Sequence, residues 1–191
     1  YQVIFGELSF SPYVDQFEEG PFPSRQLRWA KVVAKTLKRL SESGAIALYF
    51  DGAAKAYTPE MFSQLDVNDH PTLFHLFVEI WRDESRVGTE GMSIFGLPEV
   101  CVNHMDPQSA AAQATVFSLA AQMVCDEFRL YTGQRFRASE SFPWCKAKWI
   151  ENPKAAQMFM KSDQDQDQDH DIDEDDQTAD FPCGLLVLSP Q

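Results

Sequence analysis

Two long stretches of this chain carry apolar residues at helical spacing. The first covers residues 24–43, with Ser24 as a predicted N-cap and Gly44 as the C-terminal stop. The second covers residues 107–131 and is closed by Gly133. The predicted apolar faces are Leu27, Ala30, Val33, Ala34, Leu37 and Leu40 in the first, and Ala110, Ala114, Phe117, Ala120 or Ala121, Val124 and Phe128 in the second.

Short runs of branched, aromatic and other apolar residues predict about seven strands around these helices. They cover residues 3–10, with a bulge at Gly6, and residues 45–50, 73–81, 97–102, 134–138, 145–150 and 184–188. The run LFHLFVEIW at 73–81 is the most strand-like, residues 83–88 are expected to turn, and short helices are expected at 59–65 and 153–160. This order predicts an α+β fold, in which a mixed, largely antiparallel sheet is packed by two long helices.

Length and composition fit one globular domain that spans residues 1–191. A chain of 191 residues with 44% apolar residues can bury a sizeable core. No apolar run is long enough to predict a membrane span, and no signal sequence opens the chain at Tyr1. The four cysteines include no CxxC pair, so we expect free, buried thiols and a cytoplasmic protein.

Charge is concentrated in one segment, residues 163–180, which we call the acidic segment. It holds nine Asp and one Glu without Lys or Arg, in a chain whose net charge is −13. Mutual repulsion and the scarcity of apolar side chains predict that this segment is solvated and mobile. It is expected to be an insertion in the domain, because an apolar strand follows at 184–188. An acidic surface repels nucleic acid and anionic lipid and favours a cationic partner, so we expect neither nucleic acid nor membrane as a partner.

The acidic segment is also the candidate binding site, and three interpretations of it stay open: a solvated loop, an arm for a basic partner, and a weak cation site. The partner-binding candidates are Asp165, Asp167, Asp169, Asp171, Asp173, Glu174, Asp175 and Asp176. Counted from Asp165, oxygen ligands fall at positions 1, 3, 5, 9 and 12 of a calcium loop. His170 occupies the position of the glycine that such loops need for their sharp turn, and Pro182 opposes an exiting helix.

The other polar groups are expected to be structural or solvent-exposed rather than part of a functional site. Basic residues of the first helix, Arg25, Arg28, Lys31, Lys35, Lys38 and Arg39, form a stripe that is either solvated or neutralises the acidic segment. His75 and Glu79 are placed on one strand face, roughly 13 Å apart, too far to share a metal. A Cys101–His104 dyad lacks an orienting third group. We therefore expect no enzyme, no metal site and no cofactor.

The segment GMSIFGLPEV at residues 91–100 resembles the central signature of an uncharacterised bacterial domain family. In that signature a glycine with Met or Leu is followed by F-G-x-P-E and an aliphatic strand, and the agreement extends in outline over residues 25–130. Domains of this sort look similar to suppressor-of-fused-like folds, which are common among bacterial immunity proteins. The resemblance implies an α/β sandwich that neutralises a toxin of contact-dependent or type VI secretion by binding it.

Together these features predict a non-enzymatic immunity protein that binds a cognate, basic protein toxin, for which a cationic nuclease is the best fit. The alternative is a calcium-responsive regulatory protein that uses the acidic segment.

Overall fold

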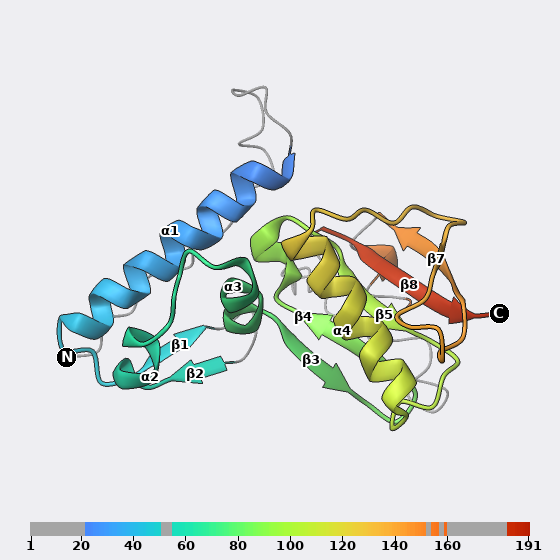
Figure 1. Cartoon of the computed structure of the whole chain (residues 1–191), viewed down its shortest axis with the longest axis horizontal. Coiled ribbons are helices and arrows are strands. Elements are labelled where there is room, and N and C mark those ends of the chain that lie inside the picture. The colour runs from blue at the N-terminus through green and yellow to red at the C-terminus, as the bar shows by residue number, and fades with distance from the viewer. Residues whose placement is uncertain (1–21, 51–54, 152–153, 157–158, 160–182) are drawn as a thin grey trace.

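A six-stranded mixed sheet organises the larger part of the molecule (Figure 1). The computed structural model describes residues 22–50, 55–151, 154–156, 159 and 183–191, so the predicted strand at 3–10 and the acidic segment lie outside the described residues. The strands are β3 (Glu79–Arg82), β4 (Val87–Glu90), β5 (Glu99–Val102), β6 (Arg135–Phe136), β7 (Cys145–Ile150) and β8 (Leu185–Pro190), and their order across the sheet is β3-β4-β5-β8-β7-β6. Among these described strands only β5 and β8 pair in parallel, which confirms the predicted mixed, largely antiparallel sheet.

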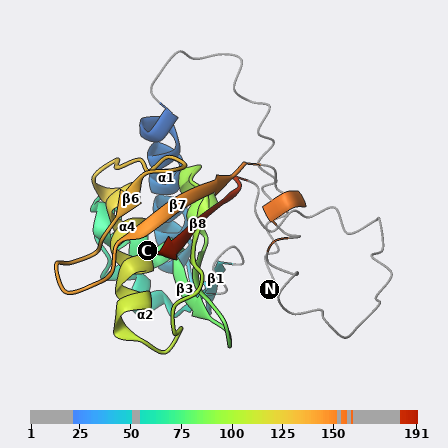
Figure 2. The same cartoon turned by 90° about the vertical axis from the view of Figure 1, so that its right-hand side faces the viewer.

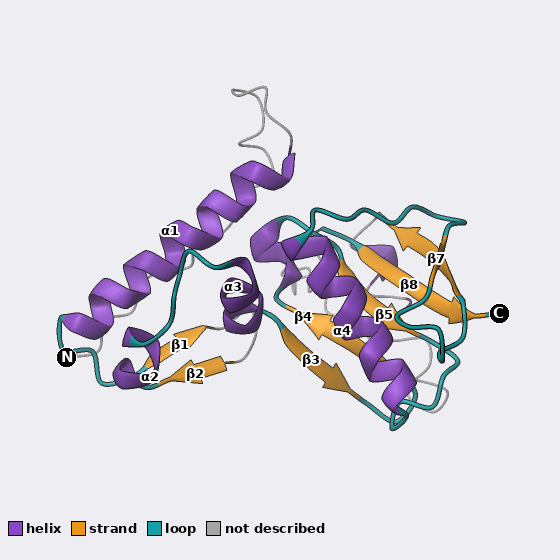
Figure 3. Cartoon of the chain, in the orientation of Figure 1, coloured by secondary structure: helices purple, strands orange, loops and turns teal. Residues whose placement is uncertain are grey.

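Helices and a small hairpin complete the fold (Figure 3). The helices are α1 (Phe22–Glu42), α2 (Pro59–Ser63), α3 (His70–Phe77) and α4 (Ala110–Cys125), with a 3₁₀ turn, η3, at Met92–Phe95; the hairpin pairs β1 (Leu48–Phe50) with β2 (Lys55–Tyr57). The two long helices share α3 as a neighbour but otherwise differ. Helix α4 packs on α3, β3, β4 and β5, whereas α1 packs on α2, α3 and η3.

The apolar stripe of α1 faces the core as predicted. Ala30 and Ala34 are fully buried, and their small side chains allow the helix to approach its neighbours closely. Leu27, Val33, Leu37 and Leu40 pack against the same core cluster, which continues through α3 and α4 to β8. The helix begins at Phe22, so Ser24 lies inside it and is not its N-cap.

The strand predicted at 73–81 is wrong over most of its length, because residues 70–77 form α3. Asp69 caps this helix: its carboxylate accepts hydrogen bonds from the Thr72 amide at 2.9 Å and the Thr72 hydroxyl at 2.8 Å. At the other end, Lys55 donates to the carbonyls of His75 at 2.8 Å and Val78 at 2.5 Å. Satisfied helix ends therefore outweigh the strand propensity of this aromatic-rich run.

The turn predicted at 83–88 is shorter than expected. The Asp83 carboxylate accepts from the amides of Ser85 and Arg86, both at 2.7 Å, and strand β4 begins immediately afterwards. Helix α4 is also shorter than predicted. Ser109 caps its start with a bond from the Ala112 amide, and the helix ends at Cys125, before the left-handed Glu127 (φ 53°).

The two faces of the sheet differ in what covers them. Helix α4 and the main core cover one face, which includes Val100, Leu186 and Leu188. Side chains of Cys101, Leu185 and Val187 point to the opposite face, which we call the second face. Ala156 and Phe159 pack there, and Figure 2 shows residues 154–156 on the side of the sheet away from α4. The chain thus enters residues 160–182 at the second face and returns at Gly184, beside the end of β7.

We predict that Gly88→Ala lowers the free energy of unfolding by about 1–3 kcal/mol, measured by urea denaturation. A Cβ at this position would clash with Trp81, whose Cε2 would lie only 2.7 Å away. The ring cannot swing aside freely, because the Trp81 indole N–H donates to the Thr89 carbonyl at 2.9 Å.

Trp81→Phe provides the matched control, since it removes the part of the ring that meets the added methyl. The loss caused by Gly88→Ala should shrink in this background. An equal loss in both backgrounds would contradict the steric explanation.

Candidate functional site

The most unusual polar group among the described residues is the buried carboxylate of Glu99. This residue starts β5 and is only 5% exposed. Its Oε2 accepts from the Thr89 hydroxyl at 2.7 Å, and its Oε1 accepts from the Gly91 amide at 3.1 Å. The Thr89 hydroxyl oxygen in turn accepts from the Val100 amide at 2.8 Å. Glu99 thereby connects the start of β5 to the end of β4.

The same carboxylate closes the N-terminal end of η3. Besides Gly91, the amides of Met92 and Ser93 donate to it, so one side chain satisfies three backbone N–H groups that the short turn leaves unpaired. Gly91 (φ 100°) and Gly96 (φ 62°) flank the turn in left-handed conformations that glycine adopts without steric cost. The signature at 91–100 therefore encodes a turn and the acidic residue that caps it.

Burial governs the protonation of this group. Desolvation raises the pKa of Glu99 from 4.5 to about 7, although the hydrogen bonds from Thr89, Gly91, Met92 and Ser93 act in the opposite direction. Burial, with a contribution from the charge of Glu99, also raises the pKa of Cys183 to about 11. Cys183 is thus a protonated thiol rather than a nucleophilic thiolate at neutral pH.

The arrangement around Glu99 favours a structural role. A carboxylate that accepts bonds from three amides and a hydroxyl is already engaged by the protein, and its burial keeps it from a dissolved substrate. What the site can do chemically is hold or release one proton, and its effect falls on η3 and on the helix α1 that packs against that turn.

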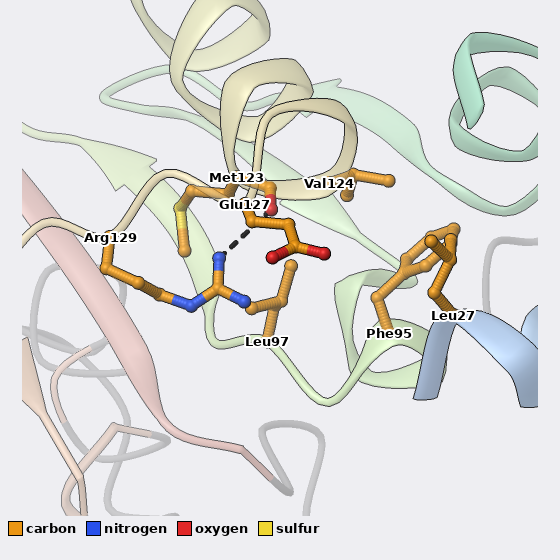
Figure 4. A pocket seen from close by; sticks show the side chains of 7 residues that line it. All are labelled: Leu27, Phe95, Leu97, Met123, Val124, Glu127 and Arg129. Carbon is orange, nitrogen blue, oxygen red and sulfur yellow. Dashed lines mark hydrogen bonds between the residues drawn. The ribbon is translucent and has the colours of Figure 1, made fainter. Parts of the chain in front are cut away.

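One small hollow lies between α1, η3 and the end of α4 (Figure 4). Leu27, Phe95, Leu97, Met123, Val124, Glu127 and Arg129 line it, and it leaves about 10 Å³, room for one water molecule at most. Arg129 donates to the carbonyls of Met123 at 3.0 Å and Phe128 at 2.8 Å, so it ties down the last turn of α4. The hollow is too small for a metabolite or cofactor.

The structure places the site residues predicted from the sequence as follows. The candidates of the acidic segment, Asp165 to Asp176, lie outside the described residues. The placement of His75 and Glu79 on one strand is wrong: His75 belongs to α3, and Glu79 opens β3 and pairs with Lys55 at 3.1 Å. Cys101 is fully buried, whereas His104 is exposed at the end of β5, so these two side chains do not form a shared site. All four cysteines are free, as predicted, but only Cys101 and Cys145 are buried, whereas Cys125 and Cys183 are partly exposed.

The basic stripe of α1 divides into two sets. Arg28, Lys35 and Arg39 are exposed, whereas Lys31 and Lys38 turn toward the body of the protein. Lys31 Nζ lies 3.2 Å from His70 Nε2, and Lys38 donates to the Leu65 carbonyl at 3.1 Å. Part of the stripe therefore serves packing rather than recognition.

A second group of cations, which the sequence analysis does not single out, lies on and beside β6 and β7; the register places Arg135, Lys146 and Lys148 on the second face. Arg135 is directly opposite Lys146, and Lys148 is opposite Val187 of β8. Arg137 stacks over the Trp144 ring at 4.7 Å from its centroid. We call Arg135, Arg137, Trp144, Lys146 and Lys148 the cationic patch. The alternation of Arg135 with Arg137, and of Lys146 with Lys148, within the two predicted strands was the signal that could have located it.

No family model, no curated protein and no solved structure matches this chain. Among the described residues, no three His, Cys, Asp or Glu side chains are grouped to hold a metal ion. Within the same residues, no helix has both the length and the apolar character to cross a membrane.

We predict that stability falls as the pH rises from about 4.5 to 7, because the folded protein holds the Glu99 proton more tightly than the unfolded chain does. This contribution is present in full below the ordinary pKa of 4.5 and is lost as the pH rises through about 7. Its full size is about 3 kcal/mol. Urea denaturation across this pH range measures it.

Glu99→Gln should remove this dependence, because an amide does not titrate, and the exposed Glu84→Gln is the matched control. An unchanged pH slope in Glu99→Gln would show that Glu99 does not gain a proton on folding.

Proposed function

We propose that this chain is a non-enzymatic binding protein, and specifically a cytoplasmic immunity protein that neutralises a secreted, type VI-like toxin by direct contact. The observation that carries the proposal is the segregation of charge. Ten acidic residues gather at 163–180, whereas the rest of the chain, with 16 basic residues, is nearly balanced. An inhibitor of a cationic toxin gains from such a distribution, because opposite potentials accelerate encounter.

The role of Glu99 supports a binding function over catalysis. Glu99 is the one residue of the signature with an ionisable side chain, and its carboxylate is engaged by the backbone of η3. The signature is then a device of the fold, in keeping with its resemblance to suppressor-of-fused-like sandwiches. Recognition falls to exposed surfaces instead. Tyr49, Met61 and Trp144 are apolar side chains that remain 45% or more exposed.

A basic toxin, such as a nuclease, is the partner that this charge distribution favours. Each screened surface pair contributes little, about 0.2–1 kcal/mol, but many of them act together during encounter. The acidic segment should therefore govern the association rate, and the folded body should govern the lifetime of the complex.

We predict that replacing Asp165, Asp167, Asp169, Asp171, Asp173, Asp175 and Asp176 with Asn, and Glu174 with Gln, slows association with the cognate toxin by about tenfold or more at low salt. The product of the gene adjacent to this one is the natural probe to test as the toxin, and surface plasmon resonance at about 50 and 500 mM salt resolves the two rate constants.

This neutral variant keeps the length of the chain, so it separates charge from tethering, which a deletion of 163–180 would not. Unchanged association would refute the steering role of the segment while leaving immunity intact. If the neighbouring toxin neither binds the protein nor loses its toxicity on co-expression, the immunity proposal itself fails.

The alternating aspartates support a second candidate, a calcium-responsive regulator, because they place oxygen ligands at five positions of a calcium-loop frame. This proposal predicts that about 1 mM CaCl₂ raises the melting temperature well beyond an ionic-strength match of NaCl. Equal melting temperatures in the two salts, measured by calorimetry, would eliminate it.

A further inference from the structure

The cationic patch is a charged surface whose partners are not supplied by the described part of the chain. Arg135, Lys146 and Lys148 are exposed, and Arg137 is half-buried against Trp144. Neighbouring strands lie about 4.8 Å apart, so these like charges repel one another. In the described residues, no carboxylate forms an ion pair with any of the four. An anionic occupant would relieve the repulsion.

The described residues that flank the acidic segment on either side both lie beside β7 and β8. Ala156 and Phe159, just before it, pack with Leu185 and Val187 of β8 on the second face. Just after it, Gly184 lies against the backbone of Ile150 at the end of β7. Lys148 is two residues from Ile150 and points to that second face. The segment is thus tethered, on both sides, beside the patch.

The tether is long enough for contact. Residues 160–182 comprise 23 residues, whose extended length is about 80 Å, and β7 is only about 20 Å long. A loop that leaves and returns at one end of β7 can therefore lie along the whole strand. A tethered ligand of this kind reaches an effective concentration in the millimolar range, above that of most free polyanions.

A competing basic surface is less well placed. The exposed cations of α1, namely Arg28, Lys35 and Arg39, lie on a helix that packs against α2, α3 and η3. Figure 1 shows α1 at one end of the molecule and β7 at the other. Proximity and local charge density both favour the patch.

We propose that the acidic segment, residues 163–180, docks in cis on the cationic patch of β6 and β7. The contact is electrostatic, so salt weakens it, and four cations leave most of the ten acidic charges uncompensated. A cationic partner then competes with the patch for the segment. This inference does not depend on the proposed immunity function, because it concerns one chain alone.

Carbodiimide coupling, which joins a lysine amine to a contacting carboxylate, tests the proposal on the full-length protein. We expect peptides that link Lys146 or Lys148 to residues 163–180, several-fold more abundant than links to Lys35 on α1. About 500 mM NaCl should abolish them. A mixture of ¹⁴N- and ¹⁵N-labelled protein should yield links within one isotope only.

Several results would overturn docking in cis on the patch: links to Lys35 as the main product, links only between the two isotopes, or no links although Lys146 and Lys148 react with an acylating reagent. The first would assign the segment to α1, and the second to another copy of the chain.

A charge-reversal cycle provides an independent measurement. Lys146→Glu with Lys148→Glu should lower the melting temperature of the full chain by about 2–4 °C more than that of the chain lacking 163–180. Lys35→Glu with Arg39→Glu on α1 is the matched control and should show no such difference. Equal shifts with and without the segment would contradict the proposal.

Discussion

The buried carboxylate of Glu99 is the contact on which most of this fold converges. Through Thr89 it joins β4 to β5, and through the amides of residues 91–93 it holds the η3 turn on the sheet. Helix α1 then packs against that turn. Because one side chain serves three elements, its loss would affect the placement of α1 as well as the local turn.

Local patterns predicted most elements but not their boundaries. The stripe of α1 was predictable because its helical periodicity is strong, and β8 because a short continuous apolar run is typical of a buried strand. The strand predicted at 73–81 was wrong over residues 73–77, because aromatic residues favour strands and the group that caps the helix, Asp69, lies outside the run. The Lys55 contacts that close α3 come from 20 residues away, and no local pattern contains them.

The candidate sites likewise divide into features that the local sequence shows and features that depend on the tertiary structure. The acidic segment is visible in composition alone, whereas the cationic patch needs the register that sets Arg135 opposite Lys146. Glu99 stood out in the signature as its one ionisable residue, yet its role required the positions of the Gly91 amide and the Thr89 hydroxyl. The sequence alone identifies the charged residues, whereas the topology of the sheet determines which groups lie beside them.

The distribution of charge has a consequence for binding. If the patch holds the acidic segment, a toxin must displace the patch. The electrostatic free energy of binding is then the difference between the attraction of the segment to the toxin and its attraction to Arg135, Arg137, Lys146 and Lys148. Such competition prevents weakly basic proteins from binding the segment but allows strongly basic ones to bind it, so specificity would arise without a dedicated pocket. It also predicts that neutralising the patch strengthens association with many cations indiscriminately, because the internal competitor is gone. The uncharged surfaces of the folded body would then have to distinguish the cognate toxin from the others.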